Sequence, residues 1–198
     1  AIDYPVVVMN DARAEAYADH WFNGKPEDEK IYIMLGEGVG GAYINASAIR
    51  NGVHNRGGEF GHMVIHPGGK QCLCGKKGCF EAYVSEKVLS SELDMTLDNF
   101  FELAAQGNKN NSNVLDEYMD NLALGINNIY TMMDCDIVLG GTVAPYLKQY
   151  DNSIKERLVN DYSFDTDADY LKISDDGGGK SGLGAALSFV ARFIDGVE

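Results

Sequence analysis

The 198-residue chain is 45% hydrophobic, which suits one globular domain with a sizeable core or two small ones. Thirty acidic residues against sixteen basic ones give a formal net charge of −14, so most of the surface repels phosphate backbones and anionic membranes. The charge excludes direct DNA binding by this chain, and no apolar run approaches the roughly 18 to 20 residues of a membrane span.

The N-terminal sequence indicates where the protein resides. Residues 1–30 lack the basic start and apolar stretch of a secretory signal, which predicts a cytoplasmic protein. The first predicted element begins close to Ala1, so we expect the chain to be cut from something longer.

The first half predicts a strand, a helix and a hairpin. "YPVVVMND" favours a strand over residues 5–9, and "DARAEAYADHWF" favours a helix from residue 11 with Asp11 as a possible N-cap. "KIYIMLGEGVGGAYINASAIRNG" is typical of two antiparallel strands joined by a tight turn at about residues 36–40. A glycine-heavy loop over residues 51–80 follows.

The second half alternates helices with short strands. Helical spacing in "NVLDEYMDNLALGINNIYTMMD" precedes the buried strand "DIVLGG", and "PYLKQYDNSIKERLV" predicts a helix starting at Pro145. "YLKIS" is a further strand, and "SGLGAALSFVARFI" a closing helix whose small residues favour tight packing on a sheet. This alternation predicts an α/β layered domain.

The segment "CLCGKKGC" places three thiols, Cys72, Cys74 and Cys79, in eight positions of a cysteine-poor chain. Clustered thiols in a reducing compartment indicate metal ligands or redox groups, and zinc prefers four tetrahedral thiolate or imidazole ligands. His62 and His66 both lie close enough in sequence to be the fourth ligand. The alternative is a set of reduced thiols without metal. The remaining cysteine, at position 135, is expected to be a small buried apolar residue.

The cluster belongs to a longer pattern. "GGEFGHMVIHPGGKQCLCGKKGCFEAYVSEKVL" contains Gly-Glu-x-Gly-His followed by Cys-x-Cys-Gly-x-x-Gly-Cys-x-Glu, and so resembles the signature of the ROK family of sugar kinases and sugar-responsive repressors. "PVVVMNDARAEAYAD", "GEGVGG" and "DIVLGG" extend the resemblance over essentially the whole chain. It implies an α/β fold, an actin-like ATPase (ribonuclease H-like) lobe with a zinc-binding loop insertion. Residues 1–22 would be a remnant of the first lobe, and residues 23–198 the C-terminal lobe, with the insertion at about 51–85.

The resemblance also implies a structural Zn²⁺ site and a sugar site. It selects His62 over His66 as the fourth zinc ligand, and it makes Asp11 the general base in the kinases of the family. The implied sugar contacts are Asn10, Asp11, Glu59, His62 and Glu81. The alternatives are that Asp11 only caps a helix, and that Glu59 and Glu81 are solvated surface acids.

Nucleotide binding is implied only for the kinases. The expected cofactor-facing residues are Gly36, Glu37, Gly38, Gly140 and Gly141. Kinases of the family usually carry Gly-Thr-Gly at the first of these turns, and Glu37 would face a triphosphate, so this chain looks more like the repressor branch. The first-lobe Asp-x-Gly-Gly-Thr motif is absent from the sequence. "LGGTVAP" fits a ribose-phosphate contact or a plain tight turn, and "GGGKS" a strand-to-helix turn.

The sequence therefore favours the effector-binding, oligomerising domain of a ROK-type transcriptional regulator. It would bind a sugar or amino sugar, form a homodimer or tetramer, and contact neither DNA nor membrane directly. The alternatives are a fragment of a glucokinase-like sugar kinase, which would need ATP and Mg²⁺, and a zinc-stabilised dimerisation module without a sugar site.

Overall fold

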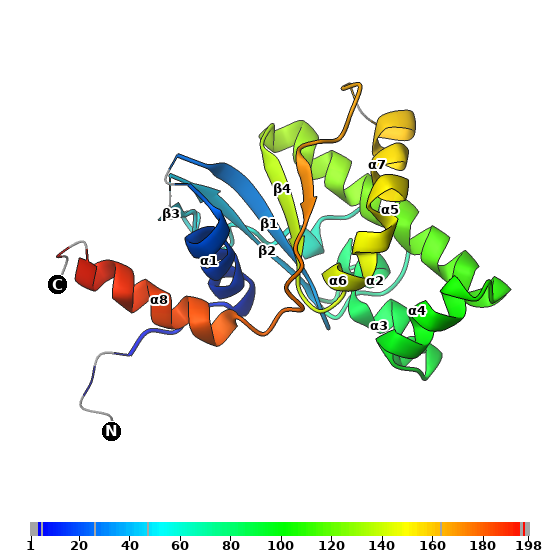
Figure 1. The fold of residues 1–198 in the computed structure, drawn as a ribbon, viewed down its shortest axis with the longest axis horizontal. Coiled ribbons are helices and arrows are strands. Elements are labelled where there is room, and N and C mark those ends of the chain that lie inside the picture. Colours follow the sequence, from blue (N-terminus) through cyan, green and yellow to red (C-terminus); the bar gives the residue numbers. More distant parts are fainter. Residues whose placement is uncertain are drawn as a thin grey trace.

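A five-stranded mixed sheet forms the centre of the molecule, with helices on both faces (Figure 1). The computed structural model describes residues 4, 6–25, 27–46, 48–162, 164–194 and 196. The strand order is β3-β2-β1-β4-β5. The strands are β1 (Glu29–Leu35), β2 (Val39–Asn45), β3 (Ala48–Ile49), β4 (Asp136–Gly140) and β5 (Leu171–Ile173). β1 to β3 form an antiparallel meander, and β4 and β5 run parallel to β1, which confirms the predicted hairpin and both later strands.

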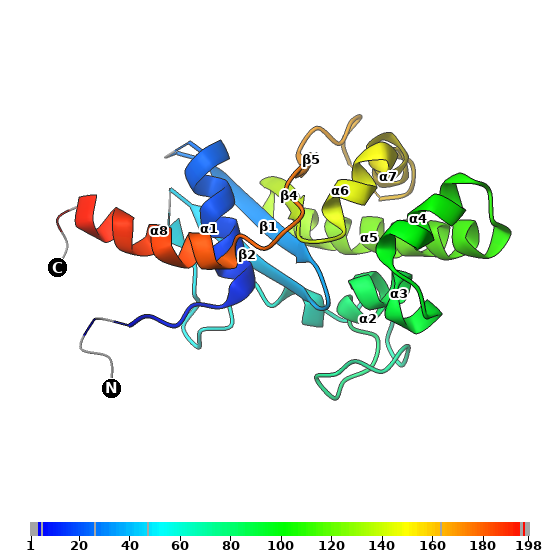
Figure 2. The ribbon, with the colours of Figure 1, turned by 60° about the horizontal axis from the view of Figure 1, so that its bottom comes forward.

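The alternation of side chains along the strands separates two cores. On one face, Ile31 and Ile33 of β1 pack in the larger core with residues of α5 (Lys109–Met133), such as Ile126. On the other face, Tyr32 of β1 joins a smaller core beneath α1 (Asp11–Asn23). Figure 2 shows α1 and α5 on opposite sides of the sheet. This layering agrees with the predicted α/β domain.

The remaining helices are short, except α8. They are α2 (Glu81–Val84), α3 (Glu86–Leu89), α4 (Leu97–Ala105), α6 (Ala144–Leu147), α7 (Asp151–Arg157) and α8 (Ser181–Ile194). Single 3₁₀ turns occupy Phe60–His62, Ser91–Leu93 and Lys148–Tyr150, and a π-helical turn occupies Leu158–Tyr162. The helix predicted to start at Pro145 is thus a chain of consecutive turns, starting one residue earlier. No helix in the described ranges is both long and apolar enough to span a membrane.

Two predictions at the N-terminus are wrong. Residues 6–9 of the expected strand form no strand, because no neighbouring strand offers them hydrogen bonds; Pro5 lies outside the described residues. Val6 and Val8 are consequently 67% and 95% exposed. The N-cap of α1 is Asn10, not Asp11: the Asn10 side chain accepts a hydrogen bond from the backbone N–H of Arg13 at 3.1 Å.

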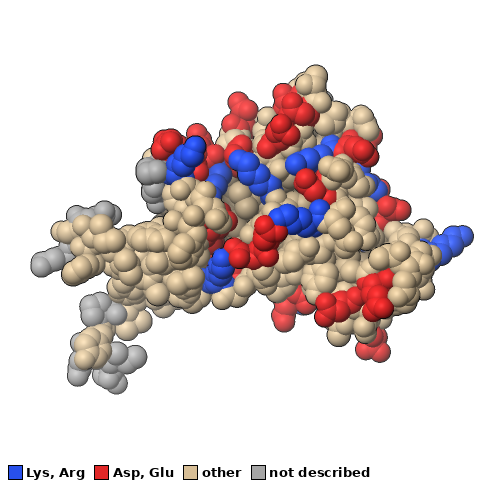
Figure 3. All heavy atoms as spheres, viewed as in Figure 1, with Lys and Arg blue, Asp and Glu red and all other residues tan. Residues whose placement is uncertain are grey.

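The closing helix α8 packs on α1 rather than on the sheet. A Cβ added to Gly184 would lie 1.7 Å from the carbonyl oxygen of Ala14, so only glycine permits this approach. The outward side of α8 exposes Leu183, Phe193 and Ile194. Figure 3 shows this flank almost without charged side chains, whereas acidic groups gather over the opposite side of the molecule.

Candidate functional site

The metal-ligand candidates meet on the loop before α2. The loop folds back on itself: the Cys72 N–H donates to Lys76 O at 2.8 Å, and the Gly78 N–H donates to Lys70 O at 2.8 Å. Gly78 adopts a φ of +82°, and a Cβ there would lie 1.7 Å from His66 O. This tight fold presents Cys72 and Cys74 toward Cys79, which lies two residues before α2.

The structure brings His62 to the three thiols. One ligand atom from each of His62, Cys72, Cys74 and Cys79 lies within 4.8 Å of every other. Cys74 Sγ and Cys79 Sγ are 3.7 Å apart, and Cys72 Sγ is 3.9 Å from His62 Nδ1. A tetrahedral zinc ion with bonds of about 2.3 Å requires sulfur atoms about 3.8 Å apart. The donor set and its spacing therefore fit a four-coordinate zinc ion.

Burial makes the thiols unfavourable as free thiolates. It raises the pKa of Cys72 to about 12 and also raises that of Cys79, while a hydrogen bond from the Lys76 backbone N–H lowers the pKa of the exposed Cys74. Cys72 and Cys79 would therefore stay protonated at neutral pH without a cation. A metal ion that binds here would displace these protons.

His66, the other candidate ligand, has a different role. Its Nε2 lies 2.6 Å from Asn121 Oδ1 on α5, and its ring contacts the edge of the Tyr83 ring at a centroid distance of 4.8 Å. The Asn121 amide nitrogen donates to Glu117 O at 2.7 Å, so its oxygen accepts the proton of His66 Nε2. His66 thus fastens the loop to α5.

The two glutamates of the predicted sugar site flank the cluster. Glu59 Oε2 lies 3.9 Å from His62 Nε2, the ring nitrogen opposite the one that faces Cys72. Glu81 accepts a hydrogen bond from the Val39 N–H at 2.9 Å, and its other oxygen lies 3.6 Å from Cys72 Sγ. Glu81 thus has a partner in the fold, whereas the Glu59 side chain is 52% exposed, as the alternative of a solvated surface acid expects.

Asn10 and Asp11 occupy the exposed first turn of α1. No hydrogen bond or ion pair in the described residues joins either one to Glu59, His62 or Glu81. Their link to the loop is indirect. The Arg13 guanidinium donates to Asn51 Oδ1 at 3.1 Å, and to the carbonyl oxygens of Asn55 and Gly57 at 2.9 Å each. No sequence pattern predicts this role of Arg13.

The predicted cofactor-facing glycines lie where β1 and β4 end. Gly36 N–H donates to Gly38 O at 3.0 Å, which closes a tight turn with Glu37 exposed at its tip. Gly140 leaves no room for a side chain beside the Tyr32 hydroxyl, and Gly141 adopts a φ of +83°. Steric demands alone account for the last two glycines. Residues 174–180 form the strand-to-helix connection expected for "GGGKS".

A hollow of about 610 Å³ opens beside these turns, between α3, α4 and α6. Its lining includes Glu86, Thr142, Tyr146 and Gly177. Thr142 donates a hydrogen bond to Glu86 Oε2 at 2.5 Å, and the Tyr146 hydroxyl donates to Asp98 at 2.6 Å. The sequence analysis did not identify Glu86 and Thr142. The position of Thr142, directly after the glycines that end β4, was a signal that could have identified it.

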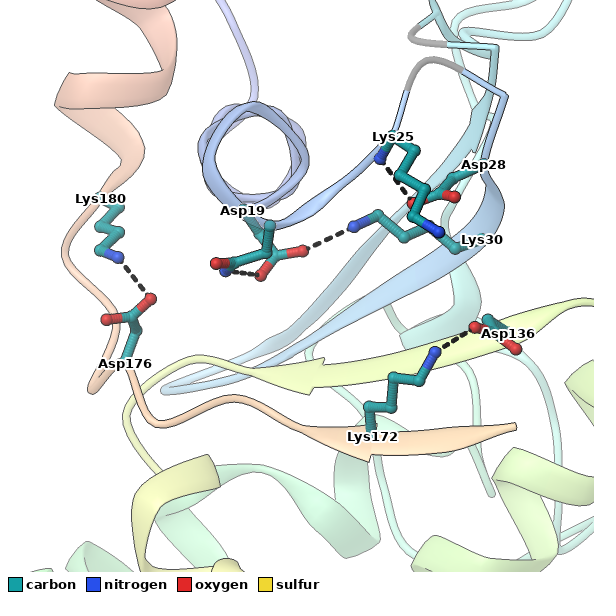
Figure 4. A network of polar contacts seen from close by, with 9 residues as sticks. Asp19, Lys25, Asp28, Lys30, Asp136, Lys172, Asp176 and Lys180 are labelled. Atoms are coloured by element: carbon teal, nitrogen blue, oxygen red, sulfur yellow. Dashed lines mark hydrogen bonds and ion pairs between the residues drawn. The ribbon is translucent and has the colours of Figure 1, made fainter. Parts of the chain in front are cut away.

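A second hollow, of about 440 Å³, lies between α1 and strands β4 and β5. Figure 4 shows Lys30 of β1 reaching Asp19 on α1, and Lys172 of β5 reaching Asp136 of β4. The Lys30 and Asp19 side chains are each only 8% exposed, with the charged atoms 2.9 Å apart. None of the predicted site residues lines this hollow.

The chain belongs to the ROK family, whose model matches residues 1–191. Its mixed α/β architecture is the actin-like fold of ROK sugar kinases: a ROK glucokinase from Streptomyces griseus, solved in complex with glucose and AMPPNP, superposes with a TM-score of 0.78 at 27% identity, covering 93% of this chain and 68% of that one.

Similar proteins of known function fall into two classes. The xylose repressor of Bacillus subtilis is 32% identical over 141 residues, which cover 68% of this chain and 37% of the repressor. An N-acetylmannosamine kinase of Yersinia pestis is 28% identical over 147 residues, which cover 71% of this chain and 51% of the kinase. The matched region thus spans 37% and 51% of the length of these two relatives, and the family contains both sugar-related repressors and sugar kinases.

Proposed function

We propose that this chain is the sugar-binding effector and oligomerisation domain of a ROK-family transcriptional regulator, without its DNA-binding head and first lobe. The observation that carries the proposal is the grouping of Glu59, His62 and Glu81 around four metal-ligand candidates. A pyranose offers hydroxyls that both donate and accept, and carboxylates with an imidazole match them. We also propose that the loop before α2 binds a zinc ion.

The proposed zinc ion has a structural role, because four protein ligands leave no open position. His62 would bind it through Nδ1, which faces Cys72, and this fixes the opposite nitrogen as the one directed toward Glu59 and the sugar. Glu81 ties the same cluster to the first residue of β2. Loss of the ion would therefore disturb both ends of the sugar site.

The relatives narrow the choice of sugar. One is named for xylose, one for N-acetylmannosamine, and the solved glucokinase holds glucose. We propose a neutral pentose, hexose or amino sugar as the effector. Asn10 and Asp11 would complete its contacts from the first turn of α1, which Arg13 holds against the loop.

A kinase fragment is the second candidate, favoured by the presence of both Asn10 and Asp11, which the kinase alternative would use to hold and deprotonate the sugar. Its phosphate-facing residues would be Gly36, Glu37, Gly38, Gly140 and Gly141. Glu37 opposes this candidate, because an exposed carboxylate at the tip of the turn repels a triphosphate.

Calorimetric titration with xylose, glucose and N-acetylmannosamine tests the proposal. At least one sugar should bind, and Glu59→Gln should weaken it about tenfold or more, as expected when a charged hydrogen-bond acceptor is lost. The exposed Glu156 on α7, outside the site, provides the matched control Glu156→Gln. ADP formation from Mg·ATP and the bound sugar, abolished by Asp11→Asn, would establish the kinase. A zinc-containing oligomer that binds none of the three sugars would support the dimerisation module.

A further inference from the structure

The carboxyl ends of three parallel strands converge on glycine-rich turns. β1 runs into Gly36–Gly38, β4 into Gly141 and Thr142, and β5 into residues 174–180. A Cβ on Gly178 would lie 3.2 Å from the Thr142 backbone nitrogen, so the second and third turns touch. Open α/β sheets bind ligands at this edge, and glycine-rich turns at strand ends are typical phosphate-binding sites. We call these three turns the glycine edge.

Glu86 places a carboxylate on the glycine edge. Its backbone N–H donates to Gly36 O at 2.7 Å, which fixes the first residue of α3 against the end of β1. Its side-chain Oε2 accepts a hydrogen bond from Thr142 Oγ1 at 2.5 Å, while that hydroxyl also lies 3.4 Å from Leu35 O. A threonine hydroxyl has one proton, so the shorter contact to Glu86 uses the donor that a phosphate oxygen would need.

The charges around the glycine edge do not offset this carboxylate. Glu37 adds a second acidic side chain, exposed at the tip of the first turn. In the third turn and beside it, Lys180 and Lys148 are already paired with Asp176 and Asp175. A polyphosphate placed here would meet uncompensated negative charge at short range, where screening by salt is least effective.

We propose that Glu86 is a specificity-determining residue that makes the glycine edge reject polyphosphates. The inference deepens the proposed function and rests on it, because a regulator that responds to sugar alone must not depend on ATP. Glu86 also ties the segment that follows Cys79 to the ends of β1 and β4, and a glutamine keeps the length and the hydrogen-bonding ability needed for that tie. The charge can therefore be removed while the structural contact is kept.

The test is equilibrium binding of Mg·AMP-PNP and of inorganic triphosphate to the 198-residue chain and its variants. Glu86→Gln should bind both at least about tenfold more tightly than the wild type, because one like charge is removed at short range. Adenosine, which carries no phosphate, should bind the two proteins equally. Glu92→Gln is the matched control: Glu92 is exposed on the neighbouring 3₁₀ turn, so the variant removes the same net charge away from the edge.

The proposal is overturned if Glu86→Gln gains no polyphosphate affinity, or if Glu92→Gln gains as much, which would assign the effect to net charge. Circular dichroism of both variants establishes that each is folded, and Thr142→Val provides an independent check. This variant removes the Thr142–Glu86 hydrogen bond but keeps the Glu86 charge, and should gain no polyphosphate affinity.

Sugar titration of the same samples separates the two proposals. A gain in polyphosphate affinity without any sugar binding sustains this inference, while the regulator proposal fails.

Discussion

The glycine-rich loop over residues 51–80 and helix α1, with α8 packed on its outer side, both lie against the sheet but are held by opposite means. The loop depends on polar contacts and on four metal-ligand candidates, whereas the helix pair depends on close packing of small residues. If the loop binds zinc as proposed, its stability should depend on the metal. The stability of the helix pair should depend on side-chain volume and only weakly on metal ions.

Removing one ligand should give the largest effect. Cys79 is fully buried in the cluster, and Cys79→Ser should abolish zinc binding. The expected loss in free energy of unfolding is about 4 kcal/mol, the stabilisation given by a ligand at a thousandfold its dissociation constant. Elemental analysis and thermal denaturation measure both. Cys135→Ser, outside the cluster, should keep the metal. An equal loss in both variants would contradict a metal-dependent loop.

The helix pair should respond next, through volume. Gly184→Ala places a methyl group against the Ala14 carbonyl and should cost about 1 to 3 kcal/mol through overpacking. Gly182→Ala in the same helix has open space and should stabilise by up to about 1 kcal/mol through helix propensity. Chemical denaturation of the two variants compares them directly. Similar values would show that α8 is not held by this close approach.

Arg13 connects the two regions, so its loss should loosen the loop without unfolding the helix. Arg13→Ala removes three hydrogen bonds to residues 51–57 and should cost about 1.5 kcal/mol, at the low end for charged donors because the contacts are partly exposed. Amide hydrogen exchange in residues 51–57 should accelerate. Arg56→Ala, exposed in the same loop, is the control and should leave exchange unchanged.

The smallest effect concerns pH. Burial raises the pKa of Glu15 on α1, although its carboxylate accepts a hydrogen bond from the Gly179 N–H at 2.8 Å; Asp11 on the same helix raises it further. A raised folded-state pKa means that stability is lost as pH rises through it. Glu15→Gln should therefore match the wild type below pH 4.5, the unperturbed value, and be more stable at neutral pH. Denaturation at both pH values checks the sign.

The hairpin and the later alternation of strands and helices were predictable because their hydrophobic periods are local. Residues 6–9 were not: their composition favours a strand, but a strand exists only where another offers hydrogen bonds. Because residues 6–9 have no neighbouring strand in the described chain, we expect this segment to repack or to pair with a second chain.

The site could be predicted only in part, for a similar reason. Spacing alone left His62 and His66 equal, and the choice of His62 came from the family resemblance. The fold places His62 beside the thiols and His66 beside Asn121. The Thr142–Glu86 contact joins residues 56 positions apart, and no sequence pattern connects them. Long-range polar pairs of this kind depend on the packing of α3 against the sheet, which local periodicity does not encode.

Helix α1 contacts a different partner on nearly every turn. Its N-cap and first residue are Asn10 and Asp11, Arg13 binds the loop, Glu15 binds the connection before α8, and Asp19 binds Lys30 of the sheet. A helix of this length moves as a stiff rod, so a displacement of its first turn cannot remain there. A molecule that binds Asp11 and displaces the first turn would therefore also move α8, which packs on α1.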